Sequence, residues 1–312
     1  MLEFSHKPVM LEECMDGLAL KPGGIYFDGT VGGGNHSYEI LKRSSPNSRL
    51  IATDLDDEAI AAASEKLSPF NGRFTIYKSN YKEFENVFEK AGVDKIDGAL
   101  LDFGISSHQI DDEDRGFSYK IASAPLDMRM DTTSPLTAEI VLNTYSEAEL
   151  SKILKDYGEE TFARQIARNI VKYRENKPIK TSGEFSEIIR SSIPAKFRFG
   201  APCERKSYQA IRIEVNKELD GLYDLVVGLT RRLKKGGRIV ILTFQSLEDR
   251  IVKEAFRYMQ TPCTCPSNFP VCVCGKKAEI EIVNRKPITA SEQELKDNSR
   301  SKCAKLRIAE KL

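Results

Sequence analysis

The first hundred residues alternate between short apolar runs and longer segments whose apolar residues recur at helical spacing. The apolar runs predict strands at Ile25–Asp28, Leu50–Asp54, Phe74–Lys78 and Ile96–Asp102. The amphipathic segments between them predict helices at Tyr38–Arg43, Glu58–Leu67 and Phe84–Ala91. Strands that alternate with helices usually form a parallel sheet joined by right-handed crossovers, so this part of the chain predicts an α/β fold.

The alternation stops after Asp102, and residues 145–193 have a helical pattern instead. Two capping boxes, Ser146 with Glu149 and Thr181 with Glu184, each precede an apolar helical face. We therefore expect a helical subdomain, over residues 110–212, inserted between two parts of a sheet domain, residues 1–109 and 213–312.

The sheet pattern returns in the last third of the chain. An amphipathic helix is expected over Val215–Leu233, then a turn at Gly236–Gly237 and a strand over Arg238–Thr243. Ser246 is expected to cap the next helix, with Asp249 near its N-terminus. The last two strands are predicted at Glu279–Val283 and Leu306–Ala309.

The glycine-rich segment Asp28–Ser37 lies between the first predicted strand and helix, where nucleotides bind in open α/β sheets. Its glycines let a ligand approach the main chain closely. A dinucleotide fingerprint fits poorly because Ser37 stands at its third glycine position. S-adenosylmethionine fits better, since its ammonium group favours a nearby carboxylate and it has no pyrophosphate. A purely structural glycine turn remains the third alternative.

Three predicted strands end in a carboxylate, at Asp28, Asp54 and Asp102. The carboxyl ends of parallel strands meet at one edge of a sheet, so these side chains are expected around one crevice. Asp54 is placed to accept hydrogen bonds from both hydroxyls of a ribose, each contributing roughly 1.5 to 3 kcal/mol.

A long irregular segment follows Asp102 and has the character of a functional loop. Arg115 and Arg129 are candidates to bind phosphates, and Phe117 or Tyr119 to stack on an extruded base. The simpler interpretation, that the arginines pair with neighbouring carboxylates and the aromatics fill an interface, is favoured for each side chain taken singly.

Charge is distributed unevenly along the 312 residues, although the net charge is only +1. Residues 1–163 carry 16 Lys or Arg against 29 Asp or Glu, a net charge of −13, whereas residues 164–217 carry +8 and residues 218–312 carry +6. The basic middle segment is a candidate phosphate-binding face, or else a solvated helical surface. No apolar run reaches eighteen residues and the N-terminus lacks signal-peptide features, so we expect a cytoplasmic protein.

Histidine and cysteine offer few metal ligands with standard spacing. Of the three histidines, His36 is the best placed to touch a ligand, whereas His6 and His108 are expected to be plain polar residues. Two Cys-x-Cys pairs lie within the segment 263–274, at Cys263, Cys265, Cys272 and Cys274. Their spacing is tighter than the usual C-x2–4-C, so reduced thiols are favoured over a structural zinc site.

Taken together, these motifs resemble the bacterial small-subunit (16S) ribosomal RNA cytosine-N4 methyltransferases over almost the whole chain. The matching segments are 6–13, 28–37, 97–119, 125–131, 157–160, 209–216 and 246–253. The resemblance implies a class I S-adenosylmethionine-dependent methyltransferase, with a Rossmann-like, mostly parallel seven-stranded sheet and a helical insertion for RNA recognition. It also implies that the partner is the small ribosomal subunit with its RNA.

By position, the resemblance assigns the methyl donor to a set of seven residues. They are Gly34, Asn35, His36, Asp54, Tyr81, Asp102 and Gln109. Asn35 stands where relatives often have Gly, and Tyr81 replaces a Phe while keeping an aromatic face for adenine. Gln245 occupies a position usually held by His, so no general base is assigned there. The cysteine pairs are absent from many members, which indicates that methyl transfer does not need them.

Asp102 is the best catalytic candidate, because a carboxylate there can accept a hydrogen bond from the cytosine amine as the methyl arrives. The basic insertion, with Arg198, Arg205 and Lys206, is expected to bind RNA phosphates. Two other functions stay open: a non-catalytic ribosome-assembly factor with a retained donor pocket, and a dinucleotide-dependent oxidoreductase. The target nucleotide, the oligomeric state and any metal at the cysteines are not determined by the sequence.

Overall fold

The computed structural model describes residues 8–198, 202–266, 271 and 273–312, apart from the side chains of residues 107 and 108. The chain divides into two compact units, residues 1–104 with 221–312 and residues 105–220. The predicted insertion, 110–212, falls inside the second unit. His6 and Cys272 lie outside the described residues, as does the side chain of His108.

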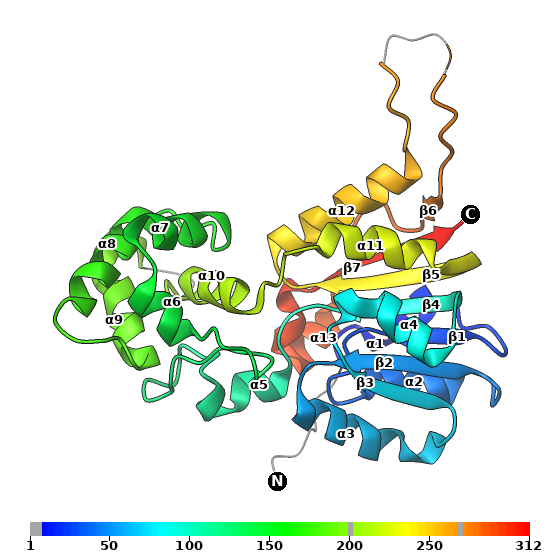
Figure 1. Ribbon diagram of the computed structural model, residues 1–312, viewed down its shortest axis with the longest axis horizontal. Helices are drawn as coiled ribbons and strands as arrows, with labels where there is room; N and C mark the ends of the chain where they lie inside the picture. The colour runs from blue at the N-terminus through cyan, green and yellow to red at the C-terminus, as the bar shows by residue number, and fades with distance from the viewer. Residues whose placement is uncertain (1–7, 199–201, 267–270, 272) are drawn as a thin grey trace. The chain divides into compact units, whose positions relative to one another are not determined.

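Within the described residues, seven strands of the first unit form one sheet in the order β3-β2-β1-β4-β5-β7-β6 (Figure 1). They are β1 Ile25–Asp28, β2 Arg49–Asp54, β3 Phe74–Lys78, β4 Ile96–Asp102, β5 Leu233–Thr243, β6 Ile280–Ile282 and β7 Lys305–Lys311. The pairs from β3 to β5 are parallel, and β7 is antiparallel to both β5 and β6. The expected mostly parallel, seven-stranded α/β sheet is confirmed.

Helices cover both faces of this sheet, which is why its central strands are apolar on both sides. The helices of the unit are α1 Leu11–Leu18, α2 Asn35–Arg43, α3 Asp57–Leu67, α4 Phe84–Ala91, α11 Leu222–Arg231, α12 Ser246–Gln260 and α13 Glu292–Asp297. The neighbours Tyr26 and Phe27 in β1 point to opposite faces. Tyr26 joins a buried cluster with α1 and α2, and Phe27 packs edge-on against Phe88 of α4 at 5.2 Å between ring centroids.

The second unit is helical and has its own hydrophobic core. Its helices are α5 Ser107–Asp111, α6 Ala138–Thr144, α7 Glu147–Asp156, α8 Ala163–Arg174, α9 Ser182–Ser192 and α10 Arg205–Asn216. Both predicted capping boxes are present, at the starts of α7 and α9. In each box the Ser or Thr hydroxyl and the Glu carboxylate satisfy backbone N–H groups that no helical carbonyl reaches.

Three local predictions in the last third of the chain are wrong in detail. The helix expected over Val215–Leu233 is broken, because α10 ends at Asn216 and Lys217 is left-handed (φ 49°). Gly236–Gly237 does not form a turn before the strand but lies inside β5. The register of β5 against β4 shifts there, because Ile96 pairs with Leu233 and Gly98 pairs with Arg238.

The third correction concerns the start of α12. Gln245, rather than Ser246, is the N-cap residue, and Glu248 accepts from the backbone N–H groups of Phe244 and Gln245. Asp249 pairs with Arg307 at 2.7 Å and with Lys305 at 3.2 Å, so its carboxylate has specific partners besides the helix dipole.

None of the helices that the structure describes is both long enough and apolar enough to cross a bilayer.

Candidate active site

The loop after β1 is fixed by the buried carboxylate of Asp28. One oxygen accepts from the Ser37 hydroxyl at 2.6 Å, and the other accepts from the Thr30 backbone N–H at 3.1 Å. Burial raises the pKa of Asp28 to about 6, against the opposing effect of these hydrogen bonds. Asp28 is 1% exposed, so the structure assigns it to holding the loop.

Glycine is required where this loop becomes α2. Gly34 is left-handed (φ 76°), and a Cβ there would lie 3.1 Å from the Ala63 Cα of α3. The side chain of Asn35, the first residue of α2, accepts a hydrogen bond from the Lys66 ammonium. The loop therefore passes so close to α3 that only glycine fits at position 34.

Asp54, at the end of β2, is held by three backbone N–H groups. Gly32 donates to Oδ2 at 2.8 Å, and Leu55 and Asp56 donate to Oδ1 at 2.8 and 3.0 Å. Burial nevertheless raises the pKa of this carboxyl. A carboxylate offers about four acceptor positions, so these bonds leave one position on Oδ2. Asp54 can thus accept one further hydrogen bond, whereas the sequence interpretation expected it to accept two, one from each hydroxyl of a ribose.

Asp102 ends β4, and its backbone N–H donates to Thr30 Oγ1 at 2.7 Å. Burial, together with the negative charges of Asp28 and Glu248, raises the pKa of its carboxyl to about 8. The side chain is still 26% exposed, so a ligand can reach it. A cluster of crowded carboxyls of this kind favours a cation, which relieves their repulsion.

His36 lies beside Asp102 and is neutral. Its Nε2 is 3.1 Å from the Val9 carbonyl oxygen, which can only accept, so Nε2 carries the proton and Nδ1 does not. Burial lowers the pKa of His36 to about 4. The bare Nδ1 faces Asp102 Oδ2 at 3.7 Å, which is longer than a hydrogen bond.

An aromatic pair lies near the same strand ends. Tyr81 begins a short 3-10 helix, Tyr81–Glu83, and its ring lies 5.6 Å from the ring of Phe103, the residue after Asp102. Phe103 is 3% exposed, whereas Tyr81 is partly exposed and so offers aromatic surface to a ligand. Sequence reasoning found Tyr81 by resemblance but missed Phe103, because an apolar residue after a strand has no local signal of function.

Gln109 belongs to the second unit, which is described by itself. Its Oε1 accepts from the Ser106 backbone N–H, and its own N–H donates to Ser106 Oγ, both at 3.1 Å. This reciprocal arrangement caps the start of α5. A donor-binding role for Gln109 stays a prediction.

The candidate RNA contacts in the loop after Asp102 divide into structural and accessible residues. Arg115 is buried and donates to the carbonyls of Arg129 and Met130, and Arg129 forms a two-pronged pair with Asp127. Phe117 is part of the second unit's core. The simpler interpretation therefore fits Phe117 and Arg129, and the bonds given for Arg115 go to backbone carbonyls. Of the four residues, Tyr119 alone contributes to a surface groove.

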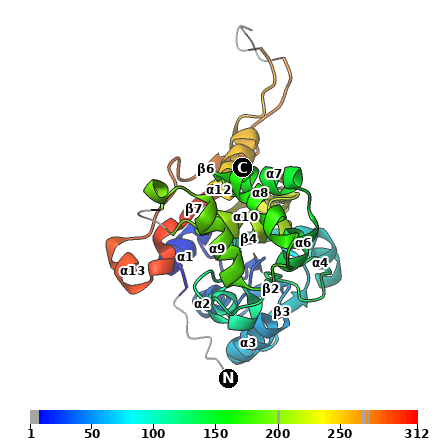
Figure 2. The same cartoon turned by 90° about the vertical axis from the view of Figure 1, so that its left-hand side faces the viewer.

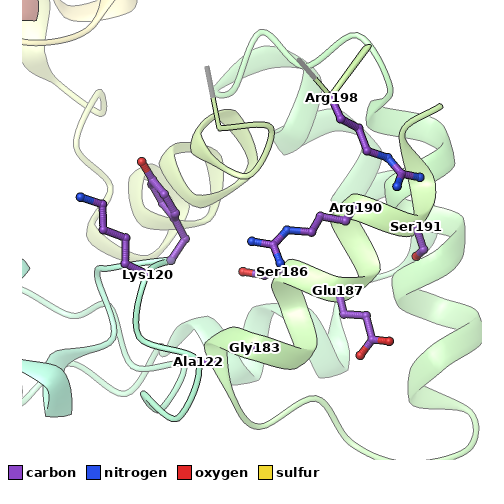
Figure 3. Close-up of a pocket in the computed structure, with 9 residues that line it drawn as sticks. Lys120, Ala122, Gly183, Ser186, Glu187, Arg190, Ser191 and Arg198 are labelled. Carbon is purple, nitrogen blue, oxygen red and sulfur yellow. The ribbon is translucent and has the colours of Figure 1, made fainter. Parts of the chain in front are cut away.

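That groove, with a volume of ≈ 790 Å³, lies within the second unit and is open to solvent (Figure 3). Lys120, Arg190 and Arg198 contribute positive charge to its lining, and Glu187 contributes the one carboxylate among the lining residues that the structure describes. Arg190 extends from α9 and also donates to the buried Glu204. Of the predicted basic face, Arg198 lines the groove, whereas the Lys206 ammonium donates to the Glu159 carbonyl at 2.9 Å.

Two further residues of the first unit bear on the site although no role was predicted for them. Glu248 is 2% exposed and is one of the charges that raise the pKa of Asp102. Gln245 is also buried, and its Nε2 donates to Glu248 Oε1 at 3.0 Å. Gln245 therefore orients the buried carboxylate of Glu248.

Comparison with known proteins identifies the family. The model of the MraW methylase family matches residues 3–312. A ribosomal RNA small subunit methyltransferase H from Lachnospira eligens is 52% identical over 312 residues, covering 100% of this chain and 99% of that protein. A protein of the same name from Clostridioides difficile is 49% identical over 312 residues, covering 100% of both chains. The chain belongs to the MraW methylase family.

Proposed function

We propose that this protein transfers a methyl group from S-adenosylmethionine to the exocyclic N4 amine of a cytosine in small-subunit ribosomal RNA. The observation that carries the proposal is the partly exposed Asp102 carboxyl among buried acidic groups, in a chain of a methylase family. The named relatives are small-subunit ribosomal RNA methyltransferases. The resemblance described above supplies the cytosine N4 atom.

The chemistry of the first unit fits a cationic methyl donor. S-adenosylmethionine bears a sulfonium and an ammonium group, and burial together with the negative charges of Asp28 and Glu248 raises the pKa of the Asp102 carboxyl. In the proposed complex, Asp54 accepts one ribose hydroxyl with its remaining position, and Tyr81 covers the adenine. Gly34, Asn35 and His36 form the wall that the start of α2 supplies, and Gln109 completes the proposed set.

The bound donor supplies an activated methyl group on its sulfonium sulfur. Asp102 is proposed to accept a hydrogen bond from the N4 amine, which keeps the nitrogen lone pair directed at the methyl carbon. As the N–C bond forms and the C–S bond breaks, the sulfur keeps the bonding electrons and the nitrogen becomes positive. The Asp102 carboxylate then takes the surplus N4 proton. The positive charge of the bound donor is proposed to ionise the Asp102 carboxyl, so that it is a carboxylate able to accept this proton.

The second unit is proposed to bind the RNA. Single-stranded RNA is bound by cations along its phosphates and by aromatic rings under its bases. The groove combines both, with Lys120, Arg190 and Arg198 for phosphates and Tyr119 for a base (Figure 3). Lys120 and Arg198 are exposed, so a phosphate can reach them without unfolding the unit.

Transfer of labelled methyl from S-adenosylmethionine tests the function directly. Small ribosomal subunits that lack the modification are incubated with the protein, and the RNA is digested to nucleosides for mass analysis. The expected result is label in N4-methylcytidine. Label on another base would overturn the substrate assignment. Donor binding without any transfer would support a non-catalytic assembly factor, and binding of a nicotinamide dinucleotide in its place would support an oxidoreductase.

A further inference from the structure

The described residues between α12 and β6, 261–266, 271 and 273–279, form an arm that extends away from the rest of their unit (Figures 1 and 2). Its base is closed by a hydrogen bond from the Glu279 N–H to the Met259 carbonyl at 2.8 Å. The proposed methyl transfer uses no residue of this arm. The proposed function therefore gives the cysteines of the arm no role.

Three thiols converge on one point of the arm. The sulfur atoms of Cys263, Cys265 and Cys274 all lie within 4.8 Å of one another. Cys274 Sγ is 3.7 Å from Cys263 Sγ, far longer than the bond of about 2.05 Å in a disulfide. Tetrahedral zinc with Zn–S distances of about 2.3 Å separates its sulfur ligands by about 3.8 Å. The Cys263–Cys274 distance is close to this value.

The backbone around the thiols also suits a metal-bound thiolate. The Val273 N–H donates to Cys265 Sγ at 3.4 Å, and N–H groups directed at sulfur stabilise its negative charge. Gly275, directly after Cys274, is left-handed (φ 67°) and lets the chain turn at the cluster. Lys276 and Lys277 follow, and their charges offset that of three thiolates bound to one divalent ion.

Apolar packing does not account for the convergence of the sulfur atoms. Val271 and Val273 are 69% and 74% exposed, and the described residues of the arm form no helix or strand before β6. A segment of this length without a core needs another cross-link to hold a fixed conformation.

We propose that Cys263, Cys265 and Cys274 bind a structural zinc ion that joins the two sides of the arm. The ligands come from both sides, with Cys263 and Cys265 on the outgoing side and Cys274 on the returning one. From the Cys-x-Cys spacing alone, the sequence interpretation favoured reduced thiols. The short sulfur-to-sulfur distance joins Cys263 and Cys274, which are eleven positions apart, so the spacing within each Cys-x-Cys pair does not report it.

Metal analysis of the full chain tests the proposal. The protein is produced without a histidine tag in zinc-supplemented medium, freed of loosely bound metal by gel filtration, and measured by plasma mass spectrometry. One zinc per chain is expected. The double variant Cys263→Ser/Cys274→Ser should contain less than a tenth of that amount. The matched control Cys303→Ser, on a thiol outside the arm, should keep the full amount.

Residue-resolved alkylation provides a second readout that does not depend on a variant folding. In the native protein, the three arm thiols should react with iodoacetamide at least about tenfold more slowly in the presence of zinc than after a chelator has removed it. Cobalt(II) added to the metal-free protein should give the intense sulfur-to-metal charge-transfer absorption of thiolate ligation. Metal-free protein from zinc-supplemented cells, with arm thiols that react equally with and without chelator, would overturn the proposal. Stoichiometric iron in place of zinc would also contradict it.

Discussion

The two units of this protein hold their charged side chains in different ways. In the sheet unit, Asp28 and Asp54 are each fixed by hydrogen bonds from the backbone or a hydroxyl, and burial raises the pKa values of both, as it does that of Asp102. In the helical unit, the cations of the groove are exposed side chains on a separate core. The sheet unit is thus pre-organised for one small cation, and the helical unit offers exposed cationic side chains to a large anion.

The two units therefore differ in how their charged groups affect stability before a ligand binds. Crowded carboxyls lower the stability of the donor-free sheet unit. Binding of a cationic donor offsets their repulsion and raises the stability again. Exposed arginines and lysines cost little when free, and their gain on binding a polyanion depends on salt. Four predictions follow from this contrast, in order of decreasing effect.

The largest effect is expected at Asp102. Asp102→Asn preserves the shape of the side chain but removes the proton acceptor, so the rate of methyl transfer should fall at least about 100-fold. Thermal unfolding without donor should show no loss of stability, because the variant lacks a buried acidic group. A variant that transfers methyl at the wild-type rate would remove Asp102 from the mechanism.

Asp54→Asn is expected to weaken donor binding by roughly 10- to 100-fold, the effect of losing one charge-assisted hydrogen bond. Calorimetric titration with S-adenosylmethionine measures this affinity. Asp57→Asn is the matched control, because Asp57 is only three residues away but is 70% exposed and pairs with Lys78 on the surface. Equal affinities in the two variants would mean that Asp54 serves the loop alone.

The groove predicts a change in salt dependence. The double variant Lys120→Ser/Arg198→Ser should bind small-subunit RNA more weakly and lower the slope of log affinity against log salt by about 1.4, from about 0.7 for each lost phosphate contact. Arg190 is kept because Glu204, 4% exposed, depends on it. Lys172→Ser, on the exposed surface of α8, is the control for general charge. An unchanged slope in the double variant would place the RNA elsewhere.

The smallest expected effect is on stability as a function of pH. Because Asp102 keeps its proton up to about pH 8 when folded but only to about pH 4 when unfolded, the folded state binds the extra proton in between. The melting temperature of the donor-free protein should therefore fall by a few degrees as the pH rises from 6 to 8. The Asp102→Asn variant should show a flatter profile over the same range, and an equally steep one would assign the effect to other groups.

How far the sequence predicted this structure depends on whether a feature is local. The strand ends at Asp28, Asp54 and Asp102 were predictable because an apolar run that stops at a carboxylate is a local signal. The capping boxes at Ser146 and Thr181 were predictable for the same reason. Gly236–Gly237 was misplaced because the bulge in β5 depends on its pairing with β4, which no pattern within β5 reports.

Long-range contacts explain what the sequence left undetermined in the candidate site. One acceptor position on Asp54 is occupied by the N–H of Gly32, which lies 22 residues earlier in the chain. No local pattern around Asp54 reports this contact. Likewise, Arg190 and Lys120 come together in the groove only through the packing of the helical unit. Of the cations that line the groove, Arg198 was named from the sequence, whereas Lys120 and Arg190 were not.

The central claim, that crowded carboxyls of the sheet unit bind the cationic methyl donor, is tested most directly by proton release on binding. Calorimetric titration of S-adenosylmethionine at pH 7 in buffers of different ionisation enthalpy gives the number of protons exchanged. Because the pKa of Asp102 is about 8 in the free protein, the wild type should release most of one proton as the donor's charge drives ionisation. Asp102→Asn should release almost none. Tight donor binding with the same proton exchange in both proteins would contradict the account.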